Sequence, residues 1–201
     1  MDKMNKKITK VVVIGSGIMG SRIACHFANI GVEVLLLDIL NPNKEEIKES
    51  IFLRNKIVNE SLKDTLKSKP SPIYSKKFIN RIQTGNLTDD IEKISDADWI
   101  IEAIIENLEI KKTLFNNIEK YRKKNSIISS NTSGIPINQM TQGRSDDFCK
   151  NFCGTHFFNP PRYLKLLEII PSEKTNPDLI NFLMSYGEKF LGKKTVLCKD
   201  T

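Results

Sequence analysis

The hydrophobic positions of this chain alternate between short continuous apolar runs and longer stretches with helical spacing. The run at 10–14 is typical of a strand buried on both faces, and over 18–30 apolar residues recur at the spacing of one helix face. Gly31 stands where a helix end favours glycine, and a second apolar strand follows at 32–38. The pattern predicts a strand–helix–strand unit of about thirty residues.

The rest of the chain continues this alternation. A long polar helix is predicted at 44–67, ended by the prolines that follow, and 67–77 is a linker-like stretch rich in lysine, serine and proline. Further strands are predicted at 81–85, 98–103, 126–130, 155–159, 166–170 and 195–198, and further helices at 108–123 and 177–191. The fold class is therefore α/β: a Rossmann-type doubly wound, mostly parallel sheet, with additional strands after a dinucleotide-binding core.

Composition limits the number of domains and leaves the nature of a charged partner open. With 201 residues, 39% hydrophobic and 27% charged, the chain fits one globular domain, with residues 1–7 as a tail. The net charge of +7 suits an anionic partner, although a lysine-biased composition explains it equally well. Because the lysines are scattered, a phosphate-bearing small molecule fits better than nucleic acid, which we do not expect as a partner.

The sequence shows no targeting signal. The apolar run behind the basic N-terminus is too short for a signal peptide, and no run approaches the ~20 residues that a membrane helix needs. We therefore expect a cytoplasmic protein with four reduced cysteines. Cys149 and Cys153 form a C-x-x-x-C without a second ligand pair, so we expect no metal site.

A glycine motif between the first strand and the first helix carries the binding chemistry. It fits G-x-G-x-x-G and consists of Gly15, Ser16, Gly17, Ile18, Met19 and Gly20. Such glycines permit a tight turn, close approach of a pyrophosphate to the helix N-terminus, and close helix–strand packing. Asp38, at the end of the next strand, can accept hydrogen bonds from ribose hydroxyls and repel a 2′-phosphate. The motif predicts NAD as the cofactor, in preference to NADP.

Two later stretches follow predicted strands and carry reactive side chains. They are Ser-Asn-Thr-Ser at 130–133 and His-Phe-Phe-Asn-Pro at 156–160. Glu168 lies within an apolar run, where a carboxylate is unfavourable unless it is paired, so we expect it to have a buried partner. Since polar residues at the carboxyl ends of parallel strands line the ligand crevice, these stretches are the candidate catalytic residues. A lone histidine is otherwise usually structural, and His26 is interpreted as an ordinary helix residue.

At these motifs the sequence resembles the 3-hydroxyacyl-CoA dehydrogenase family, along almost its whole length. The stretches that carry the resemblance are GSGIMG, IIEAIIENLEIKK, SSNTSG, GTHFFNP, LKLLEII and CKDT. TLKSKPSP, GRSDDF and PPRYLKLLEIIP are most similar to the dehydrogenase segment of a bacterial multifunctional fatty-acid oxidation protein. The resemblance implies hydride transfer between (S)-3-hydroxyacyl-CoA and NAD, giving 3-oxoacyl-CoA in β-oxidation.

The resemblance also implies roles for individual residues. His156 is similar to the family's general base, Glu168 to the carboxylate that orients it, and Ser133 to a residue that binds the substrate oxygen and lies against the cofactor. The further implied cofactor contacts are Glu106, Lys111 and Asn159, and the implied contacts to the CoA phosphates are Ser61, Lys67 and Lys69. A solvated helix face would give the same pattern at Glu106 and Lys111.

The resemblance further implies that members continue after CKDT with another active-site asparagine and a helical domain that forms the dimer. We therefore expect this chain to be the NAD-binding domain, 1–201, without the C-terminal helical domain, and its parent to be a homo-oligomer through that domain. Alone it should turn over substrate weakly or not at all, and expose an apolar patch on the last strands and helix, around 182–191.

Two alternatives remain open from the sequence. One is a dehydrogenase of hydroxy acids that carry no CoA, against which the long lysine-bearing helix argues. The other is a non-catalytic NAD-binding module, or a folded fragment.

Overall fold

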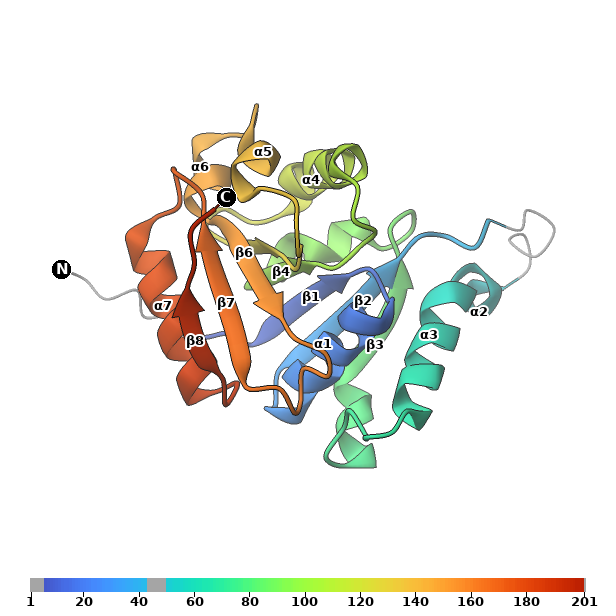
Figure 1. Cartoon of the computed structure of the whole chain (residues 1–201). Helices are drawn as coiled ribbons and strands as arrows, with labels where there is room; N and C mark the ends of the chain where they lie inside the picture. The colour runs from blue at the N-terminus through green and yellow to red at the C-terminus, as the bar shows by residue number, and fades with distance from the viewer. Residues whose placement is uncertain (1–5, 43–49, 201) are drawn as a thin grey trace.

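The fold is built on one sheet of eight strands in the order β3-β2-β1-β4-β5-β6-β7-β8 (Figure 1). It is seen in a computed structural model that describes residues 6–42 and 50–200. The strands are β1 (Lys10–Ile14), β2 (Glu33–Asp38), β3 (Ile82–Asn86), β4 (Trp99–Glu102), β5 (Ile127–Ser130), β6 (Phe152–Phe157), β7 (Leu166–Pro171) and β8 (Lys194–Leu197). Neighbouring strands are parallel except β6 and β7, which are antiparallel. The predicted doubly wound sheet with added strands is confirmed.

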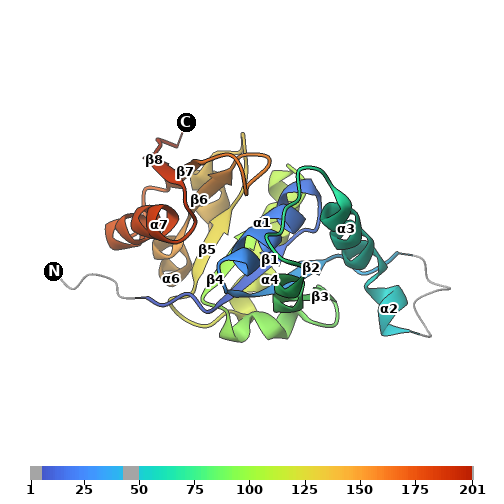
Figure 2. The same ribbon diagram turned by 90° about the horizontal axis from the view of Figure 1, so that it is seen from below.

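Helices cover both faces of the sheet, as Figure 2 shows from below. They are α1 (Ile18–Asn29), α2 (Ile51–Arg54), α3 (Lys56–Lys67), α4 (Leu108–Tyr121), α5 (Ile137–Thr141), α6 (Asp146–Lys150) and α7 (Pro177–Lys189), with 3-10 helices η1 (Lys76–Arg81) and η2 (Ile91–Asp96). Alternate residues of β1 divide the core: Val11 and Val13 pack with α1, α3 and α7, and Val12 and Ile14 pack with α4, α5 and α6. The continuous apolar runs of the sequence are explained by this two-sided burial.

The prediction of one long helix at 44–67 is wrong for its described part. Residues 44–49 lie outside the described residues, and the remainder forms α2 and α3 with Asn55 between them. Asn55 has φ −95° and ψ 17°, and its side-chain oxygen accepts a hydrogen bond from Asn86 at 2.7 Å. A side chain that bonds to a neighbouring strand end favours a break in the helix, and helical periodicity does not reveal it.

Three further differences concern the start of one strand, two short helices and the expected apolar patch. The strand predicted at 155–159 begins earlier, at Phe152, because its pairing with β5 starts there. The short helices α5 and α6 follow strand β5 where the sequence predicts no element. The apolar patch expected on the last strands and helix, around 182–191, is present only in part. Leu183, Tyr186 and Leu191 are buried. Phe190, directly after α7, and Val196 and Leu197 on β8 are exposed.

Within residues 6–42 and 50–200, no helix is both long enough and apolar enough to cross a membrane. The same residues contain no group of three or more histidine, cysteine or acidic side chains that could hold a metal ion. All four cysteines are free thiols.

Candidate active site

The glycine loop between β1 and α1 has two glycines that packing requires and one that it does not. Gly15 has φ +98°, and a Cβ there would lie 2.5 Å from the carbonyl oxygen of Ala103. A Cβ on Gly20 would lie 1.7 Å from the carbonyl oxygen of Gly15. A Cβ on Gly17 would project into open space. Gly17 therefore keeps clear the side from which a ligand reaches the N-terminus of α1.

Asp38 ends β2 beside this loop and is bonded to it. Its Oδ2 accepts hydrogen bonds from the backbone N–H and the hydroxyl of Ser16, at 2.5 and 2.6 Å, and its Oδ1 accepts from the N–H of Ile39 at 2.7 Å. The carboxylate is half-buried. This places one negative charge at the edge where a ribose would lie. Large exposed apolar side chains follow β1, β2 and β4 at the same edge, at Ile18, Ile39 and Ile105.

His156 and Glu168 form a cross-strand pair. They are directly opposed in the register of β6 and β7, and His156 Nδ1 lies 2.8 Å from Glu168 Oε2. Since a carboxylate only accepts hydrogen bonds, Nδ1 carries a hydrogen, and in the neutral form of the ring Nε2 therefore presents its lone pair. The partner that the sequence requires for Glu168 is therefore His156. Both side chains keep some exposure, 18% and 30%.

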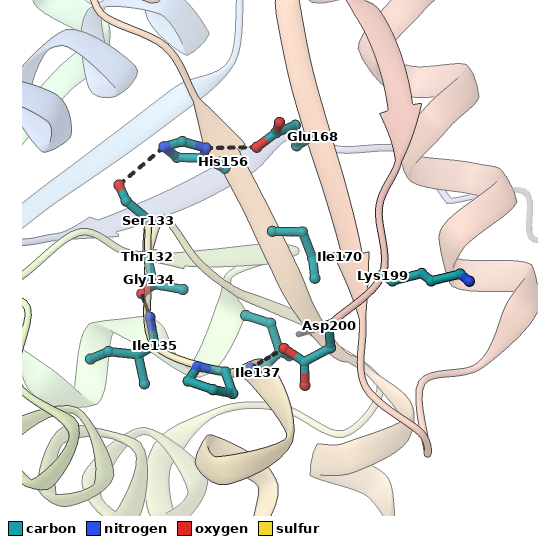
Figure 3. A pocket seen from close by; sticks show the side chains of 11 residues that line it. Thr132, Ser133, Gly134, Ile135, Ile137, His156, Glu168, Ile170, Lys199 and Asp200 are labelled. Atoms are coloured by element: carbon teal, nitrogen blue, oxygen red, sulfur yellow. Dashed lines mark hydrogen bonds and ion pairs between the residues drawn. The ribbon is translucent and has the colours of Figure 1, made fainter.

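Ser133 reaches the other ring nitrogen. Its Oγ lies 3.1 Å from His156 Nε2, and the neutral ring just described makes the hydroxyl the donor (Figure 3). The loop after β5 that carries Ser133 is tied to β6 because Asn131 Oδ1 accepts the N–H of Phe157 at 2.9 Å. Ser133, His156 and Glu168 thus form one hydrogen-bonded line from the loop after β5 and from the neighbouring strands β6 and β7.

A buried charge cluster lies behind the Ser133 loop. Lys111 on α4 is fully buried, and its ammonium lies 2.6 Å from Glu102 Oε1 and 3.2 Å from Glu106 Oε2. Glu106 Oε1 accepts hydrogen bonds from Thr132 Oγ1 and from the N–H groups of Ser133 and Gly134. Lys111 therefore does not lie on a solvated helix face, which was the alternative interpretation from the sequence. Glu106 is half-exposed.

The pKa of Glu106 reflects this setting. Burial alone would raise it, but the hydrogen bonds from Thr132, Gly134 and Ser133 and the charge of Lys111 outweigh burial and hold the pKa below its ordinary value. Glu106 is therefore a carboxylate at neutral pH, able to accept all three hydrogen bonds.

A pocket opens beside the Ser133–His156–Glu168 line. Asp200 closes its far end, accepting the N–H groups of Ile137 and Asn138 at 2.6 and 2.7 Å, which ties the last described residue to the start of α5 (Figure 3). The pocket is lined by Thr132, Ser133, Gly134, Ile135, Pro136, Ile137, His156, Glu168, Ile170, Lys199 and Asp200.

A second hollow separates the glycine loop from α3. Ser61 lies in it with Gly17 and Arg22, and the guanidinium of Arg22 donates a hydrogen bond to Asn159 Oδ1. Its complete lining is Ser16, Gly17, Ile18, Arg22, Ser61, Asp64, Thr65 and Ser68. Lys67 and Lys69 do not line it; Lys67 is exposed and lies 3.7 Å from Asp64.

Three residues of this region were not predicted as site residues from the sequence. Glu102 shares the signal used for Glu168, an acidic residue within an apolar run, and could have been found by it. Arg22 stands among buried helix residues with no local signal, and Asp200 acts through a contact with a segment 62 and 63 residues away.

Comparison with known proteins agrees with this geometry. Residues 10–201 match the family described as 3-hydroxyacyl-CoA dehydrogenase, NAD binding domain. A Bacillus subtilis protein assigned as a 3-hydroxyacyl-CoA dehydrogenase is 53% identical, over 98% of this chain and 26% of its own length. A Rickettsia felis protein assigned as the trifunctional enzyme of a fatty acid oxidation complex is 42% identical, over 98% of this chain and 26% of its own.

A solved structure supports the same assignment. The crystal structure of 3-hydroxybutyryl-CoA dehydrogenase from Escherichia coli K12 has 30% identity and a TM-score of 0.74, covering 98% of this chain and 39% of that one. The chain thus spans about a quarter of the length of the two curated relatives named above.

The fold and site define a dinucleotide-binding domain with a glycine loop after β1 and a Ser–His–Glu line at β5, β6 and β7 of the same sheet. The chain belongs to the 3-hydroxyacyl-CoA dehydrogenase family and carries its NAD-binding domain, with NAD as the cofactor. The resemblance that its motifs indicate is confirmed.

Proposed function

We propose that the protein carrying this chain oxidises (S)-3-hydroxyacyl-CoA to 3-oxoacyl-CoA with NAD, as a step of fatty-acid β-oxidation. The observation that carries the proposal is the line from Ser133 through His156 to Glu168, in a domain of this family. It is a base with an oriented tautomer and a neighbouring hydroxyl, which is what removing a proton from an alcohol requires.

The residues present fit NAD. Gly17 leaves the N-terminus of α1 open, and in the described part of the chain no side chain caps that helix and no acidic residue lies in its first turn. A pyrophosphate would accept hydrogen bonds from those N–H groups. Asp38 would hold the adenosine ribose, Glu106 and Asn159 would lie toward the nicotinamide end, and the exposed Ile18 and Ile39 would pack on the adenine side.

His156 would act as the base through Nε2. It takes the proton of the 3-hydroxyl as the C3–O bond becomes a carbonyl, and Glu168 stabilises the imidazolium that forms. NAD supplies the acceptor for the hydride that leaves C3. Ser133 would hydrogen-bond the same substrate oxygen and keep it in line with Nε2. The proton then passes from His156 to solvent, which its partial exposure allows.

The CoA part would lie on the α3 side of the second hollow, because Gly17 and Ile18 on its other side are assigned to the cofactor. Ser61 lines it with a hydroxyl and Arg22 with a guanidinium suited to phosphate oxygens, while the exposed Lys67 and Lys69 would meet phosphates at its rim. This basic, hydroxyl-bearing edge supports a CoA ester over a free hydroxy acid. The four free thiols support the further inference that the protein works in a reducing compartment, as in the cytoplasm.

Turnover of two substrates that differ only in CoA tests the proposal. NADH formation should be readily measured with (S)-3-hydroxybutyryl-CoA and be at least about a hundredfold slower in kcat/KM with free (S)-3-hydroxybutyrate, because the phosphate contacts are lost. Ser61→Ala should raise KM for the CoA ester and leave the slow reaction of the free acid unchanged. Equal kcat/KM for the two substrates would contradict the proposal.

A further inference from the structure

The backbone of the Ser133 loop is exposed, and one carboxylate oxygen accepts hydrogen bonds from three of its residues. Ser133 and Gly134 lie at the surface, and their N–H groups donate to Glu106 Oε1 at 3.0 and 3.1 Å. The hydroxyl of Thr132 donates to the same oxygen. Besides the bond from Phe157 to Asn131, which ties the start of the loop to β6, three consecutive residues are therefore held by a single oxygen next to Ser133 Oγ.

Glu106 cannot fix its own position by burial. Its side chain is 44% exposed, and a half-exposed glutamate has several rotamers open to it. Apart from the loop residues that donate to Oε1, its contact is the ammonium of Lys111, 3.2 Å from the other carboxylate oxygen, which favours one rotamer. Lys111 has little freedom, because its side chain is 1% exposed.

Glu102 in turn fixes Lys111. Its carboxylate is fully buried at the end of β4 and accepts hydrogen bonds from Lys111 Nζ at 2.6 Å, from the N–H of Ile104 at 2.8 Å, and from the hydroxyl of Ser130. Ser130 is the last residue of β5, and Ile104 follows the end of β4, so both donors are fixed by the sheet. The position of the Lys111 ammonium is thereby fixed relative to the centre of the sheet.

We propose that Glu102 and Lys111 form a positioning pair for the reaction: through Glu106 they hold the Ser133 loop so that Ser133 Oγ stays in hydrogen-bond reach of His156 Nε2. The inference deepens the proposed function and rests on it. It assigns Lys111 a role other than the cofactor contact that the resemblance implies, since its ammonium is enclosed between two carboxylates in this structure.

Replacing Lys111 alone would leave Glu102 as a buried carboxylate without an opposite charge beside it, which is strongly destabilising. The informative variant is therefore the pair Glu102→Gln with Lys111→Met, which removes both charges and keeps the approximate volumes. Glu106→Ala is a second variant that removes only the half-exposed link. Lys112→Met is the matched control, since the side chain of this next lysine of α4 is partly exposed and pairs with Glu109 on the same helix, 3.4 Å away.

The readout is nitrogen NMR of His156, which needs neither substrate nor turnover. The chain has two histidines, so its signals are separable from those of His26. Ser133→Ala supplies the reference for a lost hydrogen bond at Nε2. The paired variant and Glu106→Ala should both move the Nε2 signal toward that reference, and Lys112→Met should not. The paired variant should also lose about tenfold to a hundredfold in kcat with little change in the Kd for NAD.

The outcomes separate the inference from the proposed function. A folded paired variant with wild-type His156 signals overturns the positioning role; if that variant does not fold, wild-type signals in Glu106→Ala overturn it instead. The same shift in Lys112→Met would also overturn it. A wild-type protein that does not oxidise the CoA ester would contradict the proposed function, while the NMR comparison would still decide the role of the pair.

Discussion

His156 and Glu168 face each other across the antiparallel pair β6–β7, with Nδ1 and Oε2 2.8 Å apart. The two strands form the one antiparallel contact of the described sheet, at the point where the parallel core ends. This register turns a separation of twelve residues in the chain into a direct contact. Because both residues lie in paired strands and not in loops, the strand pairing itself holds the imidazole ring in its orientation.

Glu168→Gln tests what the carboxylate contributes. The amide oxygen can still accept from Nδ1, so ring orientation should largely survive, but the charge that stabilises the imidazolium is lost. We expect kcat to fall by about 10- to 100-fold with the Kd for NAD unchanged. Steady-state kinetics and a fluorescence titration measure the two quantities. Glu33→Gln, on the exposed start of β2, is the control, and an equal effect there would mean that Glu168 has no special role.

Two glycine substitutions separate binding from folding. Gly17→Ala should leave the melting temperature within a few degrees of wild type, because its Cβ meets no atom within 4 Å, and should weaken NAD binding by crowding the pyrophosphate. Gly20→Ala should lower the free energy of unfolding by several kcal/mol, since its Cβ would lie 1.7 Å from Gly15 O. Calorimetry and NAD titration distinguish them. Unchanged NAD affinity in Gly17→Ala would place the cofactor elsewhere.

Asp38 should set the choice between the two nicotinamide cofactors. A 2′-phosphate would meet its charge and lose the ribose hydrogen bonds, which favours NADH over NADPH by about 1–3 kcal/mol or more. Fluorescence titration gives both Kd values. Asp38→Asn should bring the two Kd values closer together, mainly because the charge that repels the 2′-phosphate is removed. Similar affinities of the wild-type chain for both cofactors would refute this role.

His26 predicts a pH dependence of stability away from the site. Burial first, then the positive charge of Lys193 and finally that of Arg162, lower the pKa of His26 to about 4, although its hydrogen bond to Leu191 O opposes the shift. Because the unfolded chain binds a proton near pH 6.5 and the folded one does not, the contribution is fully present above pH 6.5. It is lost as the pH falls toward 4, at a cost on the order of 3 kcal/mol.

Urea unfolding at pH 7 and pH 4.5 measures that contribution. His26→Gln retains a donor for Leu191 O at 3.1 Å but does not titrate, so its stability should fall less between the two pH values. The difference between wild type and variant isolates His26 from the carboxylates that titrate in the same range. Identical losses would show that His26 is accessible to protons in the folded state.

The strand pattern was predictable because burial on both faces leaves continuous apolar runs, as at Val11–Ile14, where side chains enter two different cores. The glycine motif and Asp38 were predictable for a local reason, since strand, turn and helix follow one another. Glu168 could be marked as needing a partner, because a carboxylate in an apolar run is costly. Which residue would supply that partner followed from the family resemblance and not from the run itself.

Contacts between distant segments were harder to predict. The break at Asn55 depends on Asn86, thirty-one residues later, and helical periodicity carries no trace of that bond. In the sequence, Lys111 is one of two adjacent lysines on a polar helix and nothing distinguishes it from Lys112. In the fold, Lys111 is buried and Lys112 is partly exposed. Only the position of β4 relative to α4 decides which of the two meets Glu102.

The central claim, that His156 Nε2 is the base for oxidation of a 3-hydroxyacyl-CoA, is tested most directly by NADH formation from (S)-3-hydroxybutyryl-CoA in the wild-type protein and in His156→Gln. We expect the variant to keep wild-type affinity for NAD and to lose about a hundredfold or more in kcat, the usual effect of removing a general base. A variant that retains more than about a tenth of wild-type kcat would contradict the account.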